Sequence, residues 1–380
     1  MHLPVLRYSS VVLLALTIGC GRTTDGALSD AERPGDAGVK PPDDAELPSD
    51  AAVDPRVDLS GAPSLELVAS VPLAPANGWR GSPVRIVATA AGFAVVSGSL
   101  IPDGLVPVRS GVLSEHGSVT STELEWRCQS YLGLQGGAEA TLLCFDAQTL
   151  HVASLGAKGA LAGVQSFALD EADTTVSDPT GTTVWVRTWR DTGYFTLRTY
   201  DVASGKQTHQ ETYEHDVSSP ALAPGSSGAW LTSGVLVDRA PTVTVHRLPD
   251  GASYGTSLCE DTKFDSHDLV DVSTSAVALA EMCGDDVRVS LIDVVAGSRD
   301  SIVFRKNTEG WGAPLITHWG EQLAVAAGKE IVVLDPKLQV RAVGSAPDTV
   351  YGVAAKGATL AVLSGAGDFS MLVTLFRLPE

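Results

Sequence analysis

Basic residues are scarce in this 380-residue chain, which has 26 Lys and Arg against 45 Asp and Glu and a formal net charge of -19. Proteins that bind nucleic acid neutralise its phosphates with Lys and Arg, so the charge balance excludes a nucleic-acid partner and a polybasic membrane surface. Charged residues make up only 19% of the chain, which is too few for a coiled coil or a largely disordered protein. No segment reaches the roughly 20 apolar residues of a membrane-spanning helix.

Glycine and proline are plentiful by contrast, with 38 Gly and 21 Pro. Runs of β-branched and other apolar residues recur between these turn formers as far as the C-terminus. Such runs favour strands, and Gly and Pro favour the turns between them. The composition therefore predicts an all-β fold of many short strands.

The N-terminus has the layout of a secretory signal peptide. Residues 1–19 carry one charge, Arg7, and a short apolar stretch, Val11 to Ile18, with the small residue Gly19 just before Cys20. This ending resembles the lipobox of bacterial lipoproteins, although Thr17 stands where the family usually has Leu. The resemblance implies a lipid on Cys20, which would become the first residue of the mature protein. Ordinary signal cleavage, giving a periplasmic or secreted product, is the alternative.

Residues 20–63 are predicted to be a disordered tether. From residue 21 to 63 there are no aromatic residues, six Pro, ten Asp or Glu and four Lys or Arg. Such a segment buries too little apolar surface to offset the entropy lost on ordering. We expect it to hold a folded domain, residues 64–380, away from a membrane.

Seven apolar stretches recur in the folded part at nearly constant spacing. They begin at residues 92 (GFAVVSG), 139 (EATLLCF), 183 (TVWVRTW), 228 (GAWLTSG), 276 (AVALAEM), 322 (QLAVAAG) and 358 (ATLAVLSG). Further alternating strands follow them, and two of the turns, YDVASGK and IDVVAGS, carry Asp and Gly. A period near 45 residues with room for four strands is typical of a β-propeller blade. The spacing predicts seven blades, with six or eight as alternatives because the last interval is short.

The two ends of the domain predict how the ring closes. The chain stops soon after the seventh repeat, which leaves that blade without an outer strand, and residues 64–73 (SLELVASVPL) alternate like a strand before the first complete repeat. Pairing them would remove the exposed sheet edge. The repeat layout resembles bacterial propellers of the WD-type and quinoprotein-like superfamily. The Gly-His and Trp-Asp marks of WD repeats and the tryptophan docking pattern of quinoproteins are absent, so the resemblance implies a fold and no activity.

Four cysteines remain if Cys20 carries lipid, and an even number in an exported protein predicts disulfides. Cys128 and Cys259 each precede the first strand of a repeat, and Cys144 and Cys283 each end the second strand. The start of one antiparallel strand lies beside the end of the next, which favours the pairs Cys128–Cys144 and Cys259–Cys283. Four buried free thiols are the alternative.

Candidate catalytic and metal-binding residues do not emerge from linear spacing. The eight histidines are scattered, so we nominate no catalytic pair, no metal site and no cofactor. One acidic group comprises Asp261, Asp265, Asp268 and Asp271, with His267 among them. Carboxylates are ligands of Ca²⁺, but this spacing matches no calcium loop, so we expect a solvated acidic surface. A propeller can still assemble a site at its axis from residues one blade apart.

Two tryptophans are the candidate binding residues. Trp79 and Trp311 both lie in an Asn, Gly-Trp, Gly, Pro pattern at the connection that enters a blade. They are either aromatic platforms on one face of the ring or packing between blades.

These observations favour a lipid-anchored, non-enzymatic binding or scaffold propeller of the cell envelope. Its partner would be another envelope protein, a peptide or a glycan, and its only membrane contact the lipid anchor. Gly21 after Cys20 resembles lipoproteins of the outer membrane. The alternative function is an envelope hydrolase or lyase, lactonase-like, with a site at the axis.

Overall fold

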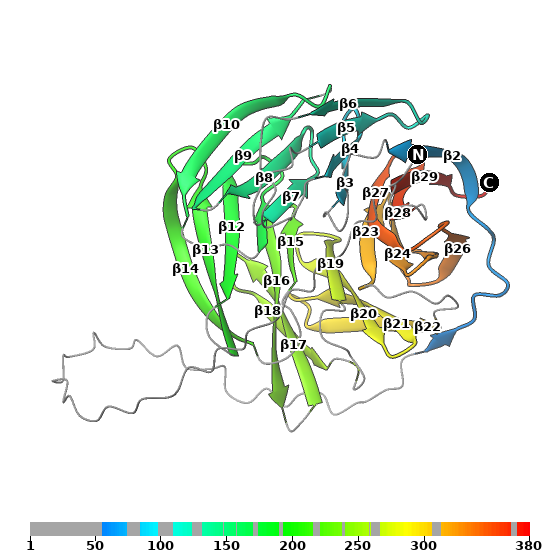
Figure 1. Cartoon of the computed structure of the whole chain (residues 1–380). Helices are drawn as coiled ribbons and strands as arrows, with labels where there is room; N and C mark the ends of the chain where they lie inside the picture. The colour runs from blue at the N-terminus through cyan, green and yellow to red at the C-terminus, as the bar shows by residue number, and fades with distance from the viewer. Residues whose placement is uncertain are drawn as a thin grey trace, which may run out of the picture. The chain divides into compact units, whose positions relative to one another are not determined.

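The computed structural model shows an all-β protein whose strands form seven blades (Figure 1). Within the described part of the chain there is no helix, and so none that could span a membrane. The structure describes residues 55–73, 84–97, 109–123, 131–146, 148–156, 158–169, 174–189, 193–215, 221–237, 240–257, 259, 267–305, 313–365 and 371–380.

Each blade is an antiparallel sheet in which strands consecutive in the chain are hydrogen-bonded neighbours. Blade 1 contains β3 (Val84–Thr89), β4 (Gly92–Ser97), β5 (Arg109–Leu113) and β6 (Val119–Glu123). Blade 2 contains β7 (Tyr131–Gln135), β8 (Ala140–Asp146), β9 (Thr149–Leu155) and β10 (Leu161–Ala168). Blade 3 contains β11 (Thr174–Ser177), β12 (Thr183–Trp189), β13 (Gly193–Asp201) and β14 (Lys206–His215). Blade 4 contains β15 (Leu222–Gly225), β16 (Gly228–Val237), β17 (Ala240–Leu248) and β18 (Ser253–Ser257).

The other three blades follow the same order. Blade 5 contains β19 (His267–Asp271), β20 (Ala276–Cys283), β21 (Asp286–Asp293) and β22 (Ser298–Arg305). Blade 6 contains β23 (Leu315–Trp319), β24 (Gln322–Ala327), β25 (Glu330–Leu334) and β26 (Val340–Ser345). Blade 7 contains β27 (Val350–Lys356), β28 (Thr359–Gly365) and β29 (Met371–Arg377), and its fourth strand is β2 (Glu66–Leu73).

The first strands of the blades line the centre of the ring. They contact one another in a closed cycle, β3, β7, β11, β15, β19, β23, β27 and back to β3. The cycle confirms seven blades and excludes the six-bladed and eight-bladed alternatives.

The N-terminal strand completes the last blade. β2 pairs antiparallel with β29, with Val71 opposite Val373 and Leu73 opposite Met371. Figure 1 shows β2, in blue, beside the red strands of the C-terminus. Strands from opposite ends of the folded region therefore share one sheet, and blade 7 has four strands like the others.

Residues before position 64 already contact the blades, so the expected end of the tether, residue 63, lies too late. β1 (Arg56–Val57) pairs parallel with β22 at the outer edge of blade 5, and Leu59 is buried in the core between blades 5 and 6. Ser64 then forms a parallel bridge with Val343 of β26. The acidic composition hid these contacts because most of residues 55–64 stay exposed and one buried apolar side chain, Leu59, attaches the stretch to the core.

Aspartate and glycine shape the turns between third and fourth strands. Asp201 Oδ1 accepts the N–H of Ser204 at 2.8 Å, and Asp293 Oδ1 accepts the N–H groups of Val295 and Ala296 at 2.9 Å. The glycines that follow, Gly205 and Gly297, both have φ of 64°, a conformation that favours glycine. The two turns predicted from YDVASGK and IDVVAGS thus have the expected chemistry.

The core is divided among the interfaces between blades. Seven clusters of buried apolar side chains occur among the described residues, and each cluster joins two neighbouring blades. Leu360 and Val362 of blade 7, for example, pack with Ala324 and Val333 of blade 6. No blade buries its faces alone, so the stability of each depends on its neighbours in the ring.

The antiparallel order gives the ring two distinct faces. Turns between first and second strands and between third and fourth strands lie on one face, which we call the turn face. Turns between second and third strands, and the connections from one blade to the next, lie on the other, which we call the connection face. The first strand of every blade runs from the connection face to the turn face.

Candidate functional site

The innermost strand of blade 5, β19, carries three ionisable side chains. Asp268 lies near its start, close to the connection face, and is half-buried. Its Oδ1 accepts the N–H of Leu269 at 2.9 Å, and its Oδ2 accepts the N–H of Ile316 in β23 of blade 6 at 3.0 Å. The carboxylate therefore joins the innermost strands of blades 5 and 6.

The environment of Asp268 changes its acidity. Burial raises the pKa of Asp268 to about 6, although the two N–H donors and the positive charge of Arg85 oppose the rise. Arg85 is exposed near the start of β3 in blade 1, three places around the ring from blade 5. The strands that carry these two groups, β3 and β19, both start at the connection face, and each group lies near that end of its strand.

The other two groups of β19 bind blade 4. His267 is buried, and its Nε2 lies 2.9 Å from Thr232 Oγ1. Asp271 accepts hydrogen bonds from the indole Nε1 of Trp230 at 2.6 Å and from the N–H of Ser226 at 2.9 Å. Asp268 and Asp271 are therefore not part of a solvated acidic surface, and that expectation was wrong for both. They act as cross-links between blades.

A buried ion pair lies on the same interface between blades 4 and 5. Glu281 of β20 and Arg288 of β21 are directly opposite each other and form a salt bridge. Glu281 is fully buried, and Arg288 is 9% exposed at its side chain. Arg288 Nη2 also donates to the carbonyl oxygen of Ser257 in blade 4 at 2.6 Å. A charge in this position requires its partner, because water does not reach it.

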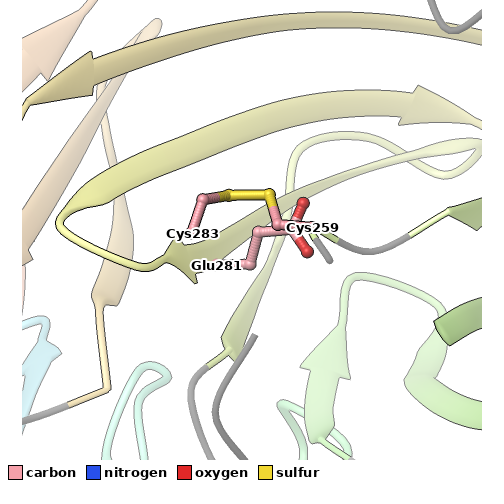
Figure 2. A group of neighbouring side chains, drawn as sticks. All are labelled: Cys259, Glu281 and Cys283. Carbon is pink, nitrogen blue, oxygen red and sulfur yellow. A yellow bond between two sulfur atoms is a disulfide. The ribbon is translucent and has the colours of Figure 1, made fainter. Parts of the chain in front are cut away.

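A disulfide lies beside Glu281, the acidic member of this ion pair (Figure 2). Cys259, which follows blade 4, is bonded to Cys283 at the end of β20, with Cα atoms 5.3 Å apart. This is the pairing that the repeat positions predict. Ligand atoms of both cysteines and of Glu281 lie within 4.8 Å of one another. The sulfurs are bonded to each other and are not thiolates, so this group is a structural link and not a zinc site in the oxidised protein.

The remaining predicted site residues are only partly visible. Cys144 is buried in β8 and is disulfide-bonded. Its predicted partner Cys128 lies outside the described residues, so that pairing stays a prediction. Cys20, Trp79 and Trp311 also lie outside them, as do Asp261 and Asp265 of the acidic group.

A cleft on the turn face is a site that sequence reasoning missed. It lies between blades 3 and 4 and has a volume of about 460 Å³. Turn residues of both blades form its rim, with Asp178 and Thr180 on one side and Ser226 and Ser227 on the other. These residues belong to turns that are distant in sequence and have no shared motif, so no linear signal could have found the cleft.

We expect Asp268 to make stability depend on pH. Its pKa is about 6 in the folded protein and about 4 in an unfolded chain, so the folded state holds the proton more tightly. Its contribution favours folding below pH 4 and is lost as the pH rises through about 6. Thermal unfolding should therefore show a steeper fall in Tm from about pH 4.5 to 7 for the wild type than for Asp268→Asn.

Asp250→Asn is the matched control for this titration. Asp250 lies in an exposed turn, and its hydrogen bond from Arg247 lowers its pKa below the ordinary value. It is ionised throughout the range, so the variant should keep the wild-type slope. If the curves of Tm against pH run parallel for the wild type and Asp268→Asn, Asp268 has an ordinary pKa.

Arg288→Met should strongly destabilise the protein, because it leaves the buried carboxylate of Glu281 without its charge partner. We expect a loss of about 3–5 kcal/mol in the free energy of unfolding, measured in urea. Arg56→Met removes the ion pair with Asp286, in which the arginine is 69% exposed, and should cost less than about 1 kcal/mol. Equal losses in the two variants would contradict the assignment of a buried pair.

Comparison with known proteins supports the fold. No family model and no curated protein sequence matches this chain. The WD40 domain of Pan2 from Neurospora crassa is 10% identical over 85% of this chain and 99% of that one, with a TM-score of 0.55. A catalytically inactive virginiamycin B lyase from Staphylococcus aureus with quinupristin is 16% identical over 82% of this chain and 99% of that one, with a TM-score of 0.54. BamB from Moraxella catarrhalis is 15% identical over 83% of this chain and 100% of that one, with a TM-score of 0.44. At these identities the similarity shows the fold alone, a β-propeller.

Proposed function

We propose that this chain is a lipid-anchored propeller of the cell envelope that acts as a non-enzymatic binding or scaffold module. The support for export and anchoring is the apolar stretch from Val11 to Ile18, with Gly19 and Cys20 after it. The acidic, proline-rich segment that follows would let the folded ring extend away from the membrane. The outer membrane is the favoured location.

One observation carries the choice of binding over catalysis. The ionisable groups at the innermost strand of blade 5 are engaged in bonds between blades: His267 with Thr232, Asp268 with Ile316, and Asp271 with Trp230. Catalytic acids and bases need freedom to exchange protons with a substrate. Groups that hold the ring together instead make its faces rigid, which suits them to present binding residues.

The proposed partner is another envelope protein, a peptide or a glycan. Rigid loops with aromatic anchors carry much of the energy in such contacts, and Trp79 and Trp311 are the proposed anchors on the connection face. The net charge of -19 argues against nucleic acid and against a direct protein contact with anionic lipid.

A hydrolase or lyase, lactonase-like, is the second candidate, and Asp268 favours it. A carboxyl group with a pKa of about 6 can accept or donate a proton near neutral pH, and Arg85 could stabilise a developing negative charge at the same end of the innermost strands. A propeller fold is shared with virginiamycin B lyase. Turnover of a panel of lactones that includes quinupristin, abolished by both Asp268→Asn and Arg85→Gln, would select this function.

The favoured function predicts that Cys20→Ser moves the protein from the membrane to the soluble fraction, because the lipid is its only attachment. Chemical cross-linking in intact cells, followed by mass spectrometry, should join the wild type to a specific envelope component. Trp79→Ala and Trp311→Ala should each reduce that cross-link while the Tm of the purified protein stays within about 2 °C of the wild type.

Three outcomes would count against this proposal. If the wild-type protein is found in the soluble fraction after cell fractionation, it has no lipid anchor. If the cross-links are unchanged in both tryptophan variants, Trp79 and Trp311 are not the binding anchors. A fall in Tm of several degrees in both variants would identify the tryptophans as packing between blades, since loss of a buried aromatic side chain costs about 3–5 kcal/mol.

A further inference from the structure

The cleft between blades 3 and 4, which we call the inter-blade cleft, has the size and composition of a ligand site. Its volume of about 460 Å³ lies within the roughly 300–1,000 Å³ of small-molecule sites. Turns from both blades line it, with Asp178, Pro179, Thr180 and Thr208 of blade 3 facing Ser227 and Pro249 of blade 4.

The apolar walls of the cleft are rigid rings. Trp185 of β12 lies at the base of the cleft; it is 4% exposed and packs in the core between blades 3 and 4, so its position is fixed but little of its surface is free for a ligand. Pro179 and Pro249 add two further rings, one from each blade. Rings held in place lose little entropy when they contact a ligand, so these walls suit an occupant with a flat apolar face.

The polar rim is built to accept hydrogen bonds. Asp178 Oδ1 accepts the N–H groups of Thr182 and Thr183 at 2.7 and 2.9 Å, and Oδ2 accepts the hydroxyls of Thr180 and Thr182. A hydroxyl that donates its proton to Asp178 can only accept from a ligand. Thr208 likewise donates to the carbonyl oxygen of Thr199 at 3.2 Å. The cleft therefore offers acceptors at Thr180 and Thr208, which suit a ligand with O–H donors.

The charge in the cleft excludes an anionic occupant. None of the described residues that line it is Lys or Arg. Burial raises the pKa of Asp178, but the hydrogen bonds from Thr180, Thr183 and Thr182 outweigh it and hold the pKa below its ordinary value. Asp178 is therefore ionised at neutral pH, and its oxygens already accept four hydrogen bonds, which leaves no room for it to bind a cation directly.

We propose that the inter-blade cleft binds a neutral mono- or disaccharide unit. A sugar ring presents an apolar C–H face, which matches the exposed proline rings of Pro179 and Pro249, and O–H donors around its edge, which match Thr180 and Thr208. The proposal names the glycan among the partners of the proposed binding function and rests on that function. It does not depend on the anchor at Cys20 or on the two tryptophans of the connection face.

Isothermal titration of the full chain with cellobiose, maltose and N,N′-diacetylchitobiose tests the proposal. We expect at least one of these sugars to bind with one-to-one stoichiometry. Ser227 lies in the exposed turn at the rim, and Ser227→Trp should block the cleft and weaken binding at least tenfold. Thr180→Val removes one acceptor with little change of shape and should weaken binding at least threefold.

Ala296→Trp is the matched control, because Ala296 is an exposed small residue in a turn of blade 5 on the same face. The Ala296→Trp variant should bind the sugar as tightly as the wild type does. If none of the three sugars binds, if Ser227→Trp binds as tightly as the wild type, or if Gly-Pro dipeptides bind there instead, the saccharide assignment is wrong. If Ser227→Trp does not fold, the affinity of Thr180→Val for the sugar tests the proposal. The outcome is independent of fractionation and cross-linking, so failure here is distinguishable from failure of the proposed function.

Discussion

The pairing of β2 with β29 is the constraint on which the other contacts depend. Seven blades contribute seven interfaces only if the last blade is complete enough to pack against the first, and the described core has one apolar cluster at each interface. Val68 and Val71 of β2 pack into the cluster that joins blades 7 and 1. One strand therefore supplies both the missing hydrogen bonds of blade 7 and part of the packing that closes the ring.

Polar contacts between blades 4 and 5 follow from the same geometry. Side chains of an inner strand alternate between its two neighbours, so His267 and Asp271 reach blade 4 while Asp268 reaches blade 6. Glu281, Arg288 and the Cys259–Cys283 disulfide add a buried charge pair and a covalent link near the connection face. Ionisable groups at the centre of a ring are thus not evidence of catalysis by themselves, because burial between blades gives them structural partners.

The sequence was informative where the signal was local or periodic. The starts of the second strands recur because those strands are buried on both sides. The pair Cys259–Cys283 was predictable because Cys259 precedes the first strand of blade 5 and Cys283 ends the second, which places both residues toward the connection face. The partners of Asp268 were not predictable, since Ile316 and Arg85 become its neighbours only when the ring closes. The inter-blade cleft has the same origin, because Thr180 and Ser227 approach each other through the packing of two blades. The burial of Leu59 was also not predicted, because the acidic composition around it indicated disorder.

Hydrogen–deuterium exchange read by mass spectrometry tests most directly whether the ring is closed by its N-terminal strand. The peptide covering Glu66–Leu73 should exchange as slowly as the outer strand Leu161–Ala168 of blade 2, and the peptide covering Met371–Arg377 as slowly as the central strand Gln322–Ala327 of blade 6, with the same response to low concentrations of urea in each pair. That result is expected if β2 opens only when the whole ring unfolds. Exchange of Glu66–Leu73 that is orders of magnitude faster, with blades 1 and 7 still protected, would show that the ring does not depend on this closure.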